Sequence, residues 1–111
     1  MDIILLLEEI TAKNLYKKLI HQLNKDFKLS NIDEEFKDTI TPEKLKRDIH
    51  ELVYRLINEK FAEYLNLLYI IDVPEIEVKK LDGSDVAIMS EQVAYLILKR
   101  EWQKVWFRNN Y

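Results

Sequence analysis

Two stretches of the sequence contain metal-binding residue types at a spacing close to that of known metal sites. Residues 50–54, HELVY, begin like the helix motif of zinc proteases, in which two histidines four residues apart bind zinc. Tyr54 occupies the position of the second histidine, so we predict no zinc site. Residues 82–91, DGSDVAIMSE, resemble a calcium-binding loop, but Gly83 is the second residue of the stretch rather than the sixth. We interpret this stretch as a helix cap and turn.

Acidic side chains also recur between residues 42 and 63. Glu59 and Glu63 have the four-residue spacing with which the helices of a bundle hold metal ions. However, charges of alternating sign at the same spacing predict a solvated face of ion pairs: Glu43, Arg47, Glu51, Arg55 and Glu59. We therefore predict no metal, no cofactor and no catalytic residue. An alternative hypothesis, an enzyme without a known motif, depends on one group of neighbouring titratable residues: Asp48, His50, Glu51 and Tyr54.

The C-terminal stretch KREWQKVWFRNNY, residues 99–111, combines cations with aromatic side chains. On a helical wheel its outer side forms a candidate interaction face: Arg100, Lys104, Phe107, Arg108 and Tyr111. The opposite side contains both tryptophans, Trp102 and Trp106, which we therefore predict to lie in the core. Cations near a helix C-terminus also complement the helix dipole, which is a purely structural explanation of the same charges.

A partner of this interaction face would be an acidic protein surface or a single-stranded nucleic acid. In the second case Phe107 and Tyr111 would stack on bases while the cations neutralise phosphates, with Lys13, Lys17 and Lys18 as further contacts. The net charge of −3, from 17 basic and 20 acidic residues, predicts no general attraction to nucleic acid or to an anionic membrane. We therefore expect a protein partner, with nucleic acid as the alternative.

Residues 93–98 are apolar almost all round the wheel, because Val93, Leu96 and Ile97 point away from the tryptophans. Together with LNLLYII, residues 65–71, they predict more apolar surface than three helices cover. We therefore predict a homo-oligomer with Val93, Leu96 and Ile97 as its self-association face. The alternative is that this face belongs to the core of a single chain and that the N-terminal segment 3–10 covers it.

Composition predicts one soluble domain over residues 1–111. The apolar runs at residues 3–7 and 65–71 are too short for a signal peptide or a membrane span, so we expect no membrane contact. The absence of cysteine excludes thiol chemistry and is compatible with the cytoplasmic location that we expect. A single glycine disfavours the tight hairpins of a β fold.

We predict an all-α fold with three long helices, at about residues 3–26, 42–71 and 85–108, in bundle-like packing that dimerisation would complete. Thr41 and Pro42 give the clearest helix start. The first helix has an alternative break near Glu9, with Thr11 as the next cap. A shift of the apolar stripe between Leu56 and Ile57 predicts different neighbours for the two halves of the second helix, or a bend near Asn58.

Two shorter features complete the predicted fold. Asp72 and Glu75 have capping-box spacing, which predicts a short helical turn over residues 75–81, with a strand as the alternative. Ser84 is the expected cap of the third helix. The leading hypothesis for function is therefore a small helical interaction module that self-associates, and the alternatives are a nucleic-acid-binding regulator and an enzyme.

Overall fold

The computed structural model describes residues 2–111, and over this range the fold is all-α, as predicted, with no strand. Six helices follow one another along the chain: α1 (Ile3–Ala12), α2 (Tyr16–Leu29), α3 (Pro42–Glu59), α4 (Phe61–Ile71), α5 (Glu75–Lys79) and α6 (Val86–Asn110). None of the helices within residues 2–111 has the length and apolar character needed to cross a bilayer.

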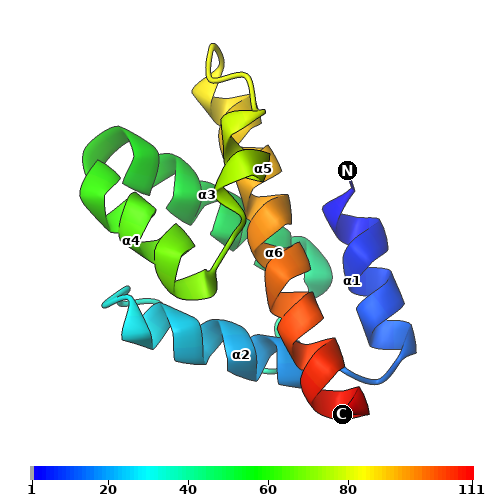
Figure 1. Ribbon diagram of the computed structural model, residues 1–111. Coiled ribbons are helices and arrows are strands. Elements are labelled where there is room, and N and C mark those ends of the chain that lie inside the picture. The colour runs from blue at the N-terminus through cyan, green and yellow to red at the C-terminus, as the bar shows by residue number, and fades with distance from the viewer. Residues whose placement is uncertain (1) are drawn as a thin grey trace.

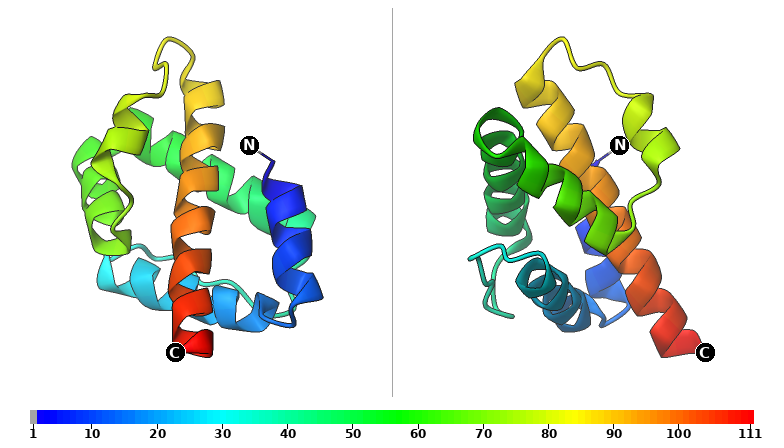
Figure 2. Two further views of the ribbon diagram at one scale, coloured as in Figure 1. Left: turned by 45° about the vertical axis from the view of Figure 1, so that its right-hand side comes forward. Right: turned by 60° about the vertical axis from the view of Figure 1, so that its left-hand side comes forward.

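The long helix α6 is the centre of the fold. It contacts α1, α2, α3 and α4, and its contact with α3 is the most extensive. Figures 1 and 2 show α6 running the length of the molecule, with α1 and α4 on opposite sides of it, α3 behind it and α2 across its C-terminal half. A helix that is surrounded in this way must be apolar on most of its circumference.

The predicted self-association face is wrong for this reason. Val93, Leu96 and Ile97 are 0%, 6% and 0% exposed in the single chain, so they belong to its own core. α1 also contacts α6, but its Ile3 lies beside Gln92 and Tyr95, whereas Leu96 lies beside Pro74 and Glu77. The alternative in which the N-terminal segment covers this face therefore stays a prediction. The prediction failed because it assumed three long helices, whereas two of them are broken and supply additional surfaces to pack against α6.

The first of these breaks separates α1 from α2, where a continuous helix over residues 3–26 was predicted. Asn14 has a left-handed backbone, with φ of 59°, which asparagine tolerates better than most residues. The chain turns there into a different direction, and the amide of Leu15 donates to the carbonyl of Ile10 at 3.2 Å. The alternative break near Glu9 is also wrong, because the Thr11 hydroxyl donates back to Leu7 within α1 and caps no second helix.

The second break separates α3 from α4 and confirms the predicted change of direction. Lys60 has φ of −143° and ψ of 62°, two residues after the expected bend at Asn58. The start of α3 is also confirmed, since Pro42 is its first residue and the amide of Lys44 donates to the Thr41 hydroxyl at 3.2 Å. The shift in the apolar stripe therefore marked a true discontinuity.

The caps before α5 and α6 differ from the prediction. The helical alternative for residues 75–81 is confirmed by α5, but Asp72 ends α4 in the left-handed conformation, with φ of 67°, and caps nothing after it. Asp85 rather than Ser84 caps α6, because its carboxylate accepts from the amide of Ile88 at 3.2 Å. The Ser84 amide donates instead to Asp82 at 2.9 Å.

The two tryptophans are not both core residues. Trp102 is half-buried against the core, but Trp106 is 40% exposed and its ring lies under the Lys13 ammonium at 5.6 Å. The last turns of α6 extend beyond the helices that surround it, as Figure 2 shows, and all residues from Trp106 to Tyr111 are exposed. The wheel placed Leu98 and Val105 correctly in the core, but it could not show that the neighbours of α6 end before Trp106.

Candidate functional site

The predicted interaction face on α6 does not form one continuous surface. The Arg100 guanidinium donates to the carbonyl of Asp72 at 3.0 Å and pairs with its carboxylate at 3.3 Å. Lys104 is mostly buried and turns toward α2. Phe107 and Tyr111 are exposed and stack on each other, with ring centroids 5.7 Å apart. Two of the cations are therefore engaged within the chain.

Lys104 leads to a buried polar cluster between α2 and α6. Its ammonium lies 2.8 Å from Asp26 Oδ2 and 3.2 Å from Glu101 Oε1. Asp26 and Glu101 are only 4% and 0% exposed. Gln22, also buried, donates to the same Asp26 oxygen at 3.1 Å. Two carboxyl groups thus share one ammonium in a place that water does not reach.

The two carboxyl groups of this cluster differ in their affinity for protons. Burial raises the pKa of Glu101 to about 9, and its hydrogen bond to Asp26 and the charge of Asp26 act in the same direction. Burial also acts to raise the pKa of Asp26, but hydrogen bonds from Glu101, Lys104 and Gln22 outweigh it and leave the pKa below its ordinary value. The nearest cation to Glu101 within residues 2–111 is Lys104, and no backbone or amide group donates to its oxygens. We therefore describe Glu101 as a neutral acid that donates to ionised Asp26.

The sequence analysis missed this cluster, although a signal for it exists. Glu101 lies four residues after Ile97 and four before Val105, and both of these are buried. Residues four apart share a helix face, so Glu101 had to follow them into the interior. The cluster joins α2 to α6, because every polar partner in it belongs to one of those two helices.

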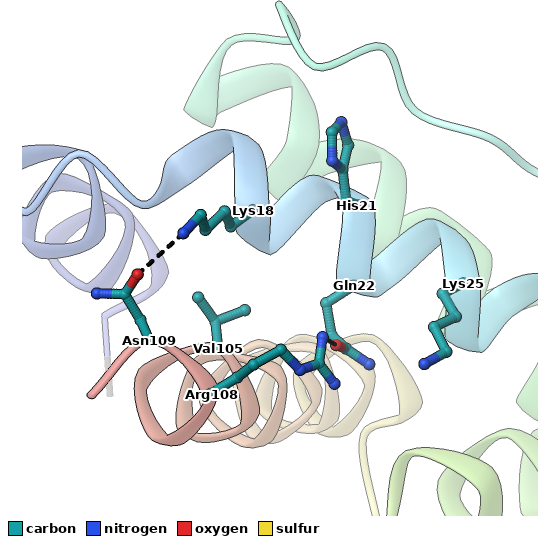
Figure 3. Close-up of a pocket in the computed structure, with 7 residues that line it drawn as sticks. All are labelled: Lys18, His21, Gln22, Lys25, Val105, Arg108 and Asn109. Carbon is teal, nitrogen blue, oxygen red and sulfur yellow. Dashed lines mark hydrogen bonds between the residues drawn. The ribbon is translucent and has the colours of Figure 1, made fainter. Parts of the chain in front are cut away.

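Next to the buried cluster, α2 and the end of α6 enclose a pocket of about 380 Å³. Figure 3 shows Gln22 and Lys25 reaching from α2 toward α6, whereas the ring of His21 points away from it. The Lys18 ammonium donates to the side-chain oxygen of Asn109 at 2.9 Å. Seven residues line the pocket: Lys18, His21, Gln22 and Lys25 of α2, and Val105, Arg108 and Asn109 of α6.

The charge of this pocket is of one sign. Lys18, Lys25 and Arg108 line it, and no lining residue is acidic. None of these three cations forms an ion pair within residues 2–111. The pocket therefore combines Arg108 of the predicted interaction face with Lys18, and it adds Lys25, which the sequence did not single out.

Neither a protein-family model, nor a curated protein, nor a solved structure matches this chain. A function for this protein is therefore inferred from the geometry of the molecule.

A second hollow, of about 460 Å³, lies between α4 and α5 and is mostly apolar. Leu65, Leu68 and Tyr69 contribute to it from α4, and Val78 from α5. Leu65 and Tyr69 are 51% and 80% exposed, and Phe61, one turn before Leu65, is 53% exposed. The three exposed side chains, Phe61, Leu65 and Tyr69, are spaced four residues apart and form one line along α4, which we call the α4 stripe.

The titratable group of the enzyme hypothesis is occupied by surface contacts. Asp48 pairs with Lys44 at 2.9 Å, and the ring of His50 lies 2.9 Å from the carbonyl of Ala87. Within residues 2–111, no group of three or more His, Asp or Glu side chains is arranged to hold a metal ion. His50 therefore contacts α6, whereas the pair of Asp48 and Lys44 lies within α3.

Proposed function

We propose that this protein is a small helical interaction module that self-associates through the α4 stripe. The observation that carries the proposal is that Phe61, Leu65 and Tyr69 are all more than half exposed along one side of a single helix. Ile76 of α5, the next helix along the chain, is a further exposed apolar side chain. Large contiguous apolar surfaces on soluble proteins mark contact sites.

The composition of α4 supports a second contact on its outer side. Its inner side is already filled by Tyr64, Leu67, Leu68 and Ile71, which are buried. Glu63 is the only charged residue between Phe61 and Ile71. The α4 stripe is turned by about 110° round the helix from these buried residues, and the described chain leaves it exposed. The apolar surplus expected from residues 65–71 is thus exposed on α4.

A second copy of the chain is the partner that best suits the α4 stripe. The stripe is symmetric about Leu65, with an aromatic residue one turn away on each side, and it spans about 12 Å along the helix. A two-fold axis at Leu65 would pair Phe61 of each copy with Tyr69 of the other.

The test is the molecular mass in solution over a wide range of protein concentrations. We expect a dimer that dissociates on dilution, and we expect Leu65→Glu and Tyr69→Glu each to give a folded monomer. The matched control is Leu29→Glu, because Leu29 is as exposed as Leu65 but lies at the end of α2. A wild-type chain that is monomeric at every concentration, or a control variant that dissociates equally, would refute the proposal.

The nucleic-acid alternative has less support. It requires the cations of the predicted interaction face, but Arg100 and Lys104 are held by Asp72, Asp26 and Glu101. It also requires Phe107 and Tyr111 to stack on bases, although they stack on each other. The proposal includes no catalytic step and no cofactor, and it retains the expected cytoplasmic location.

A further inference from the structure

The pocket between α2 and α6 is separate from the α4 stripe and is a candidate site for a ligand of its own. We propose that it binds a small phosphomonoester, with the phosphate group held by Lys25 and Arg108, while Lys18 lines the other end of the pocket beside Asn109. The surface concerned belongs to different helices from the α4 stripe, so the inference does not depend on self-association.

The charges that line the pocket favour an anionic ligand. The chain has 20 acidic and 17 basic residues, and two other cations of α6, Lys104 and Arg100, pair with carboxylates. The three pocket cations form no such pair within residues 2–111. Like charges that line one hollow repel each other, and a bound dianion reduces that repulsion. A phosphomonoester carries between one and two negative charges at neutral pH.

The second argument is that the pocket has a rigid wall. Gln22 is buried, its side-chain nitrogen donates to Asp26 at 3.1 Å, and its oxygen accepts from Arg108 Nη1 at 2.8 Å. The buried amide therefore orients the guanidinium. The Nε and Nη2 groups of Arg108 make no hydrogen bond to residues 2–111, which leaves donors for phosphate oxygens. Planar guanidinium groups that are held in this way bind phosphate through paired hydrogen bonds.

The acidic group behind this wall does not oppose an anion. Asp26 is the carboxylate that Gln22 contacts, and the Lys104 ammonium pairs with it at 2.8 Å. Glu101, the next acidic group in the cluster, holds a proton and is neutral because burial raises its pKa. The charges of Asp26 and Lys104, which lie behind Gln22, therefore cancel. The electrostatic potential of the pocket is determined by the three cations that line it.

The third argument is size. A pocket of about 380 Å³ is at the small end of the range of about 300–1,000 Å³ typical of small-molecule sites, and it exceeds the volume of a phosphate ion. Val105 gives it an apolar floor, and Asn109 adds a polar group at its edge. These features favour a phosphate attached to a small polar group such as a sugar.

The test is calorimetric titration of the full chain with ribose 5-phosphate, inorganic phosphate and ribose. We expect saturable binding of ribose 5-phosphate, weaker binding of inorganic phosphate and none of ribose. Arg108→Gln and Lys25→Gln should each weaken binding at least about tenfold, which is the loss expected for one charged hydrogen bond. Lys17→Gln is the matched control, because Lys17 is an exposed lysine of α2 that does not line the pocket.

Three results would overturn the inference. The first is no saturable binding of ribose 5-phosphate, measured while circular dichroism shows that each protein is folded. The second is an equal loss of affinity in the Lys17→Gln variant, which would indicate general charge attraction. The third is that a single-stranded oligonucleotide binds tightly and is not displaced by ribose 5-phosphate, which would indicate an extended nucleic-acid surface.

Discussion

At the scale of single residues, Glu101 is the most unusual group of the molecule. It is an acid with no solvent exposure that lies beside ionised Asp26, and burial raises its pKa from 4.5 to about 9. Between these two pH values the folded protein keeps a proton that the unfolded chain has released. The stability that depends on this proton must therefore fall as the pH rises through this window.

This difference predicts the effect of Glu101→Gln. The amide can donate to Asp26 as the neutral acid does, but it has no proton to lose. The wild-type free energy of unfolding should decrease between about pH 5 and about pH 8, by at most about 1.4 kcal/mol per pH unit, and the variant should lose most of this decrease. Urea denaturation at both pH values measures it.

Glu91→Gln is the control for this experiment, since Glu91 is an exposed acid on the same helix. If wild type and Glu101→Gln show the same pH dependence, Glu101 is ionised when folded and its assignment is wrong. Asp26 acts at the acid end instead. Its pKa is lowered on folding, so the stability that it contributes is lost as the pH falls.

At the scale of elements, the breaks between helices determine the fold. Asn14 is the residue at which α1 ends and the chain turns into α2, and its φ of 59° is unfavourable for residues with a Cβ other than asparagine and aspartate. We predict that Asn14→Ala lowers the free energy of unfolding by about 1–2 kcal/mol and that Asn14→Gly does not. Thermal or urea denaturation of the two variants decides this, and equal stability of both would contradict a conformational role of Asn14.

The elements that the sequence predicts well are those with a local cause. Thr41 and Pro42 start α3 through one hydrogen bond and one fixed backbone angle, which depend on no distant residue. The stripe shift at Leu56 and Ile57 is likewise local, and the chain bends close to it. The break at Asn14 has only a weak local signal, because asparagine is common in turns but also occurs within helices.

What the sequence could not predict depends on which helices meet. The apolar character of three residues of α6, Val93, Leu96 and Ile97, is the same whether a second chain or their own chain covers them. Their own chain covers them because the breaks in the first two predicted helices provide additional helices to pack against α6. The pocket is similar, because Lys25 and Arg108 come together only where α2 crosses α6. Helical periodicity identifies the sides of each helix but not the angle at which two helices cross.

At the scale of the whole molecule, the two candidate contact surfaces lie on different helices. The apolar α4 stripe and the cationic pocket belong to different helices, and α6 lies at the centre between them (Figure 1). This arrangement allows a self-associated form in which each pocket stays open. A variant of either surface should leave the other activity unchanged, so the two proposals can fail separately.

The central claim is that two copies meet at Leu65, and disulfide trapping tests it most directly. The chain contains no cysteine, so Leu65→Cys introduces a single thiol at the proposed two-fold axis. A disulfide forms only when the two Cα atoms come within about 7 Å of each other. Under mild oxidation we expect Leu65→Cys to give mostly a covalent dimer, and Leu29→Cys, an equally exposed position, to stay monomeric. Equal cross-linking of the two variants, or none in Leu65→Cys, would contradict the account.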